Sequence, residues 1–180
     1  MALNRKQWLW ILGIATLLWF AAFAIPEAAM KDAGGPGVTE FEMVRTADQA
    51  AQYMSEWGEA GINAAKWALW MDFPFIVLFA TFLSLLMRAA ADRCRDHGRA
   101  TLERIGRKAW AAPIVAGCFD AIEDIGLLAI LYGNTGSLAP AVATGFAIAK
   151  FSLLALVFVY LTAVLVATGL RGRPSANLSR

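Results

Sequence analysis

Four long apolar segments most constrain the fold of this 180-residue chain. The hydrocarbon core of a bilayer is about 30 Å thick, and a helix needs roughly 20 residues at about 1.5 Å each to cross it. The segments that meet this requirement are residues 8–25, 66–87, 109–132 and 140–170. The sequence therefore predicts an all-α fold, in which residues 1–180 form a single integral membrane domain built as a four-helix transmembrane bundle.

The composition agrees with a membrane location. Hydrophobic residues make up 59% of the chain and charged residues 17%, whereas a soluble domain averages about 25% charged residues. These proportions exclude an ordinary soluble domain. We expect membrane lipids, and not nucleic acid, to surround the chain.

The basic residues lie in short flanks on one side of the predicted spans. Of the 16 lysines and arginines, 12 belong to the N-terminus, the connection 88–108 and the C-terminal tail: Arg5, Lys6, Arg88, Arg93, Arg95, Arg99, Arg104, Arg107, Lys108, Arg171, Arg173 and Arg180. Short cytoplasmic loops of membrane proteins carry such an excess of basic residues. We therefore expect both termini and the basic loop 88–108 to be cytoplasmic.

The segment 26–65 between the first two spans is acidic. It contains Glu27, Asp32, Glu40, Glu42, Asp48, Glu56 and Glu59 against Lys31 and Arg45. Thr46 and Gln49 have the spacing of a capping box, apolar residues recur after them at helical spacing, and Gly58 suits a helix end. We expect a short extracytoplasmic amphipathic helix here. It would either lie on the membrane surface or connect the spans and pack on their ends.

The first span also has the three parts of a secretory signal peptide. Arg5 and Lys6 precede an apolar run, and Ala22-Phe23-Ala24 imitates a cleavage site. However, the apolar run is longer than a signal peptide needs. We expect the segment to be retained as a span.

Three carboxylates interrupt the third span. Asp120, Glu123 and Asp124 stand at i, i+3 and i+4, so they share one arc of a helix. Each ionised carboxylate near the bilayer centre costs roughly 2.5–3.5 kcal/mol, whereas each Leu or Ile contributes only about 0.3–0.6 kcal/mol. This arc must therefore face protein and not lipid.

The second and fourth spans contain ionisable residues at a similar depth. Asp72, Glu123 and Lys150 each lie roughly 9–15 Å from the expected outer end of their span. We expect them to meet in the outer half of the bundle. In this hypothesis Asp120, Glu123 and Lys150 carry any acid/base chemistry, with Lys150 setting the pKa of its partner.

The remaining candidate site residues would bind a ligand. These are Asp72, Asp124, Trp70, Phe75 and Phe79, of which the three aromatic residues would form a wall. Pro74 removes one helical hydrogen bond and predicts a kink, which either serves helix packing alone or opens a pocket beside Asp72.

Four carboxylates facing one lysine would carry a formal charge of about −3, which desolvation and repulsion disfavour. Protons, a bound cation, an amine or quaternary ammonium headgroup, or Arg45 would each neutralise it. The alternative is a structural polar network that fixes the register of the helices.

The residues that common cofactors need are missing or misplaced. His97 is the one histidine and lies in the basic loop, and Cys94 and Cys118 form no C-x-x-C pair. We therefore expect no haem, zinc or nucleotide cofactor, and we predict no metal ligands. A hard ion such as Ca²⁺ or Mg²⁺ would suit the oxygen ligands best if a metal did bind.

These motifs resemble those of an uncharacterised family of small bacterial four-span membrane proteins. The shared pattern is an Asp followed by aromatics in span two (Asp72, Phe75, Phe79), D-x-x-E and a polar residue in span three (Asp120, Glu123, Asp124), and a Lys in span four (Lys150). The family usually has Asn and Tyr where this chain has Asp124 and Phe79. The resemblance implies a four-span fold in the bacterial inner membrane and no activity.

Two functions remain open. The first is binding of a small polar or cationic ligand or lipid headgroup, with or without acid/base chemistry. The second is a role as a non-catalytic accessory or assembly subunit, which contacts partner membrane proteins through exposed faces. A proton or ion channel is less well supported, because the inner halves of the spans lack a matching relay.

Overall fold

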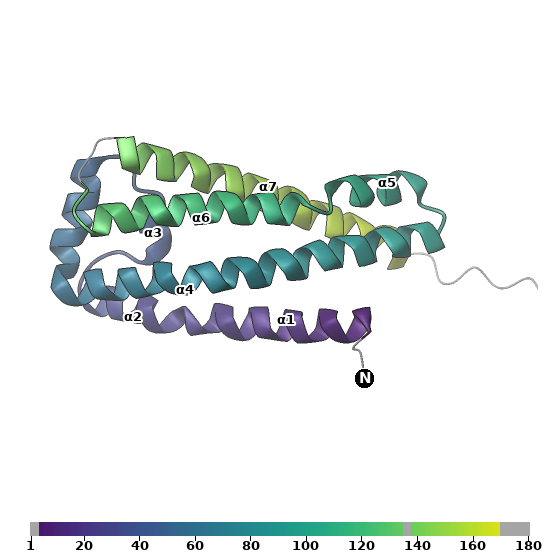
Figure 1. Ribbon diagram of the computed structural model, residues 1–180, viewed down its shortest axis with the longest axis horizontal. Coiled ribbons are helices and arrows are strands. Elements are labelled where there is room, and N and C mark those ends of the chain that lie inside the picture. Colours follow the sequence, from purple (N-terminus) through teal and green to yellow (C-terminus); the bar gives the residue numbers. More distant parts are fainter. Residues whose placement is uncertain (1–3, 135–137, 170–180) are drawn as a thin grey trace, which may run out of the picture.

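The computed structural model describes residues 4–134 and 138–169, and Figure 1 shows these residues as helices joined by short connections. The helices are α1 (Arg5–Ala22), α2 (Ala24–Asp32), α3 (Val38–Glu42), α4 (Ala47–Asp96), α5 (Ala100–Ala109), α6 (Ala112–Leu131) and α7 (Leu138–Gly169). No strand occurs in the described residues. The predicted all-α fold class is confirmed.

Among the described residues, three helical stretches are long and apolar enough to cross a membrane. They are α1 with α2 as one 28-residue stretch, α4, and α7 from Pro140 onward. Their length and composition are those of membrane-spanning helices. The predicted third span corresponds to α6, which has 20 residues and carries three carboxylates.

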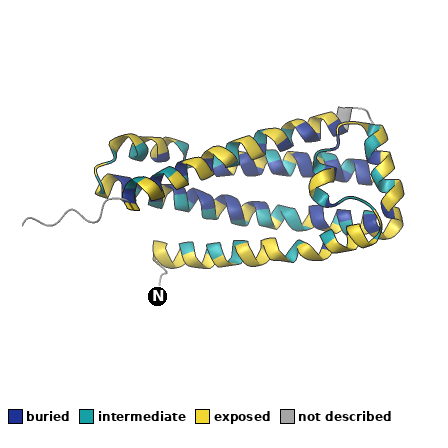
Figure 2. Ribbon diagram, turned by 180° about the vertical axis from the view of Figure 1, so that it is seen from behind, coloured by how far each residue is buried: buried dark blue, intermediate teal, exposed yellow. Residues whose placement is uncertain are grey.

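The core lies between α4, α6 and α7, which run side by side along the long axis of the molecule (Figure 1). In contrast, α1 packs on α4 and has no buried residue. Figure 2 accordingly shows most of α1 in the colour of exposed residues. Two polar contacts join it to α4, one from the Trp19 indole nitrogen to the Met71 carbonyl oxygen at 3.1 Å and one from Arg5 to Asp92. The expected bundle is therefore a closely packed group of three helices with α1 at its edge.

The helix α4 bends at Gly58. Its first turn begins where the sequence predicts, with the Thr46 side chain accepting a hydrogen bond from the Gln49 backbone nitrogen and the Gln49 side chain accepting one from the Arg45 nitrogen. Gly58 then adopts φ 57° and ψ −166°, a conformation available essentially only to glycine. The arm before Gly58 crosses the end of the bundle (Figure 1), and the predicted short helix is this arm.

Trp57 holds the arm in place. Its indole nitrogen donates to the Pro36 carbonyl oxygen at 2.8 Å, and its ring meets Phe41 edge-on with centroids 5.0 Å apart. We call this extremity, with α3 and the arm, the α3 end. Beyond the bend α4 is continuous, and Gly58 is its one residue with non-helical angles. The kink expected at Pro74 therefore does not break the helix.

The opposite extremity, which we call the α5 end, contains the loop predicted over 88–108. It is helical, because α4 continues to Asp96 and α5 follows. Asp92 joins three elements through Arg5 of α1 at 2.5 Å, Arg107 of α5 at 3.3 Å and Arg95 of α4 at 3.9 Å. The hydrogen bond from Arg5 is the main cause of the lowered pKa of Asp92. Arg171, Arg173 and Arg180 of the predicted basic tail lie outside the described residues.

Candidate functional site

The three carboxylates of α6 face the interior of the bundle, as their spacing predicts. Asp120 is 5% exposed, and Glu123 and Asp124 are 0% exposed. The adjacent Ile122 and Ile125 lie on the outer surface. The i, i+3 and i+4 positions of the carboxylates thus turn them away from the lipid-facing side of α6.

Lys150 of α7 meets this face. Its amine donates a hydrogen bond to Asp120 Oδ1 and lies 2.9 Å from Glu123 Oε2. Lys150 is itself 4% exposed. The structure therefore brings together the residues in which we expected acid/base chemistry.

Glu42 of α3 is a member of the cluster that sequence reasoning missed. Its Oε2 lies 3.6 Å from Lys150 Nζ, and its side chain is 13% exposed. Burial raises the pKa of the Glu42 carboxyl, and the opposing charge of Lys150 counteracts part of this effect. Glu42 is one of seven acidic residues in segment 26–65, and the flanking Phe41 was the one available sign that it turns inward.

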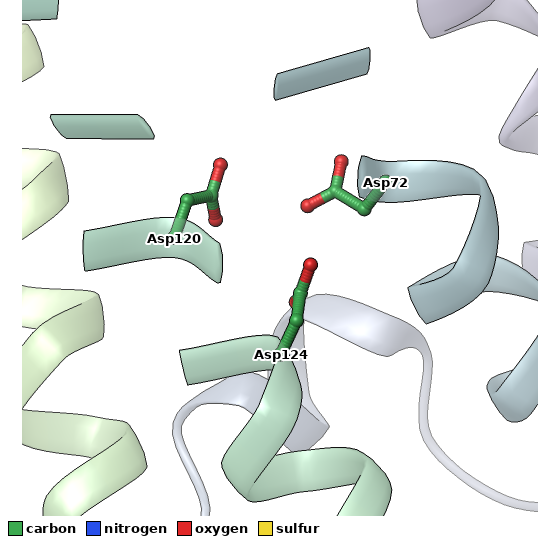
Figure 3. Close-up of side chains that lie close together, drawn as sticks. All are labelled: Asp72, Asp120 and Asp124. Atoms are coloured by element: carbon green, nitrogen blue, oxygen red, sulfur yellow. The ribbon is translucent and has the colours of Figure 1, made fainter. Parts of the chain in front are cut away.

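A second group of carboxylates shares Asp120. One oxygen atom from each of Asp72, Asp120 and Asp124 lies within 4.8 Å of the others, and Figure 3 shows the side chains converging from α4 and α6. Both oxygens of Asp124 are buried without a hydrogen-bond partner among the described residues. These three residues have the arrangement that can hold a metal ion.

The charge imbalance is larger than the sequence indicated. With Glu42 included, five carboxylates and one amine form the cluster, and their formal net charge is −4 if all are ionised. Arg45, considered as a neutralising residue, is exposed. Low dielectric surroundings strengthen the repulsion among such groups, so some must be neutralised by protons or by a bound cation.

The aromatic residues are placed differently from the expected wall. Trp70 is 54% exposed and lines a separate surface hollow of about 420 Å³ with Asn63, Lys66, Trp67 and Tyr132. Phe75 packs on Phe23, which lies between α1 and α2, with ring centroids 5.4 Å apart. Trp70 thus faces the surface hollow and Phe75 faces Phe23, so Trp70 does not line the carboxylate cluster.

Phe79 is buried and belongs to an apolar cluster with Ile76, Ala80 and Leu83. It packs against Phe75, with ring centroids 5.4 Å apart. Phe79 therefore packs among apolar side chains. Asp72, on the same helix, is the residue of α4 that reaches the carboxylates.

A second polar contact closes the α3 end beside the cluster. The Thr144 hydroxyl donates to the Val44 carbonyl oxygen at 2.6 Å and to the Pro140 carbonyl oxygen at 3.0 Å. Together with the pair of Glu42 and Lys150, it fastens the segment around α3 to α7.

No family model, curated protein or solved structure matches the chain. The resemblance to the small four-span family stays an expectation. The functional argument accordingly depends on the geometry of the cluster.

Proposed function

We propose that the chain is a four-span protein of the bacterial inner membrane whose buried cluster binds a small polar or cationic ligand or a lipid headgroup. The observation that carries the proposal is the charge imbalance, since five carboxylates from α3, α4 and α6 share an enclosed space with one amine from α7. Intramembrane ionisable groups are expensive and commonly mark binding or proton-transfer sites.

Glu123 is the residue best placed to meet such a ligand. Its Oε2 is paired with Lys150, whereas Oε1 is buried with no hydrogen-bond partner among the described residues. A buried polar atom without a partner costs about 1–3 kcal/mol, which an N–H or O–H donor on a ligand would offset. If the protein turns its ligand over, Glu123 is the proton carrier and Lys150 and Asp120 hold it in position.

The orientation belongs to the same proposal. Basic residues gather around the α5 end, and the acidic segment 26–65 forms the α3 end. The positive-inside rule puts the α5 end in the cytoplasm. The cluster then lies in the extracytoplasmic half of the protein, beneath α3.

Substitution of Glu123 by Gln tests the proposal, because Gln keeps the size of the side chain and removes its charge. The purified protein in mild detergent is heated with ethanolamine as a primary ammonium probe and, separately, with choline as a quaternary ammonium probe. We expect one of the probes to raise the melting temperature of the unsubstituted chain, and we expect Glu123→Gln to abolish the shift.

Glu59→Gln is the matched control, since Glu59 is exposed on α4, and it should keep the full shift. Size-exclusion chromatography establishes that Glu123→Gln is folded. Neither probe shifting the melting temperature, or a shift that survives in Glu123→Gln, would remove the proposal.

The alternative is an accessory or assembly subunit. The observation in its favour is that α1 has no buried residue and leaves large side chains such as Trp10, Leu17 and Leu18 exposed by 65–69%. A partner helix would cover such a surface as well as lipid does. Purification from native membranes discriminates the two, because a subunit should co-purify with a stoichiometric membrane protein and show no response to either probe.

A further inference from the structure

We propose that Asp72, Asp120 and Asp124 form a binding site for a divalent metal cation of the hard, oxygen-preferring class. The inference rests on the proposed function, because it adds a metal site at Asp72, Asp120 and Asp124 to the same cluster, beside Glu123, which would meet the polar or cationic ligand. It differs from the sequence-based expectation, which contained no metal ligands.

The spacing of the carboxylates fits one ion. Oxygens of the three residues lie within 4.8 Å of one another, and oxygens on opposite sides of one Ca²⁺ lie about 4.6–5.2 Å apart because each bond is about 2.3–2.6 Å long. Three carboxylates provide up to six oxygen atoms, which is the lower end of the coordination number of such ions. Figure 3 shows the side chains directed to a common centre from two helices.

Asp124 gives independent support. It is 0% exposed, its oxygens accept no hydrogen bond from an amine, amide or hydroxyl group of the described residues, and its side chain points toward Asp72 and Asp120 (Figure 3). A buried carboxylate that lies beside other carboxylates and has no basic partner is costly, and such groups are normally paired or coordinate a metal. Among the described residues, the Lys150 amine pairs with Asp120, Glu123 and Glu42 and not with Asp124.

The enclosure and the charge favour a small divalent ion over an organic cation. Asp124 has no exposed surface, so a partner for its carboxylate must be enclosed within the bundle. A divalent ion would also reduce the formal charge of the cluster from −4 to −2, whereas a monovalent ion would leave −3. Glu42, whose pKa burial raises, is a group that can take up a proton to reduce the charge further.

Mn²⁺ is a suitable probe, because its free and bound forms are distinguished by electron paramagnetic resonance. The purified, chelator-treated full-length protein in detergent is titrated with Mn²⁺, and we expect one bound ion per chain. Mutation of residues that support a metal ligand typically weakens binding by about 10–100-fold. We therefore expect Asp124→Asn, which removes a ligand, to weaken binding by at least about 100-fold.

Asp72→Asn is a second variant that should have the same effect from a different helix. Asp32→Asn is the control, because Asp32 is exposed at the end of α2, and it should bind as the unsubstituted chain does. Competition with Mg²⁺ and Ca²⁺, each titrated against bound Mn²⁺, shows which of the two ions the site prefers.

Three results would overturn the inference: no stoichiometric Mn²⁺ binding, binding that persists in both Asp124→Asn and Asp72→Asn, or displacement of Mn²⁺ by Na⁺ at equal concentration.

The proposed function has a separate readout, which is the melting temperature with ethanolamine or choline. If ethanolamine or choline stabilises the protein in a manner that depends on Glu123 while Mn²⁺ does not bind, only the metal inference is wrong. If neither probe nor Mn²⁺ binds, both are wrong.

Discussion

Lys150 contributes the amine on which the buried carboxylates depend. It contacts one residue of α3 and two of α6, and it is almost fully buried. A buried ion pair adds little stability compared with an apolar pair of the same shape, because both charges lose their hydration. Removing one partner is far more costly, because the remaining charges stay buried without compensation.

Replacement of Lys150 by Met should therefore destabilise the protein strongly. We expect a decrease in the free energy of unfolding of about 3–5 kcal/mol, the range measured when a buried pair loses one partner. Reversible unfolding in mixed detergent and denaturing micelles measures the change. Lys31→Met is the control, because Lys31 pairs with Glu27 on an exposed surface, and it should change stability little. Equal losses in the two variants would contradict the assigned role of Lys150.

At the scale of the helix, α4 consists of two helical parts that run in different directions and meet at Gly58. The backbone of Gly58 changes the course of the helix so that the arm covers the α3 end and the remainder runs along the bundle. A Cβ atom built at Gly58 would meet no atom within 4 Å. The requirement for glycine therefore comes from the backbone angles and not from a neighbour.

Gly58→Ala should cost about 1–3 kcal/mol of stability, the strain of a non-glycine residue in this region of φ and ψ. Gly145→Ala is a matched control, because Gly145 lies in α7, is exposed and likewise has open space for a Cβ. Alanine there should stabilise the helix by roughly 0.5–1 kcal/mol. Thermal unfolding of both variants in the same detergent compares them. A neutral Gly58→Ala would show that the arm can leave the bundle without strain.

For the whole molecule, the decisive question is whether α6 crosses the bilayer with the other three helices. The burial of its carboxylates between α4 and α7 removes them from lipid, so the remaining outward face of α6 is apolar. A crossing α6 puts Tyr132, after its last residue, on the opposite side of the membrane from Asp96, and on the same side as Asp32.

Labelling of single cysteines tests this topology in a chain that carries Cys94→Ala and Cys118→Ser. In spheroplasts we expect a membrane-impermeant maleimide to label Asp32→Cys and Tyr132→Cys, because these positions are exposed at the α3 end. Asp96→Cys, exposed at the α5 end, should react only after the membrane is opened. If Tyr132→Cys behaves like Asp96→Cys, α6 does not span the membrane.

Several features could be derived from the sequence, because their causes are local. The cap at Thr46 depends on neighbouring backbone groups, and the spans depend on uninterrupted apolar length. Gly58 was expected to end the short helix, and the structure has a bend there within α4. The arc formed by Asp120, Glu123 and Asp124 follows from helical periodicity together with the cost of a carboxylate in lipid. These arguments predicted a buried carboxylate and lysine cluster without any knowledge of tertiary contacts.

Other features were decided only by the tertiary structure. Glu42 enters the cluster because α3 lies against Lys150 of α7. Trp70 is exposed because its side of α4 is left uncovered by the neighbouring helices. The edge position of α1 and the convergence of Asp72 with Asp124 also depend on which helices touch. Periodicity assigns a side chain to a face of its own helix, but the group that lies opposite is determined by contacts between distant segments.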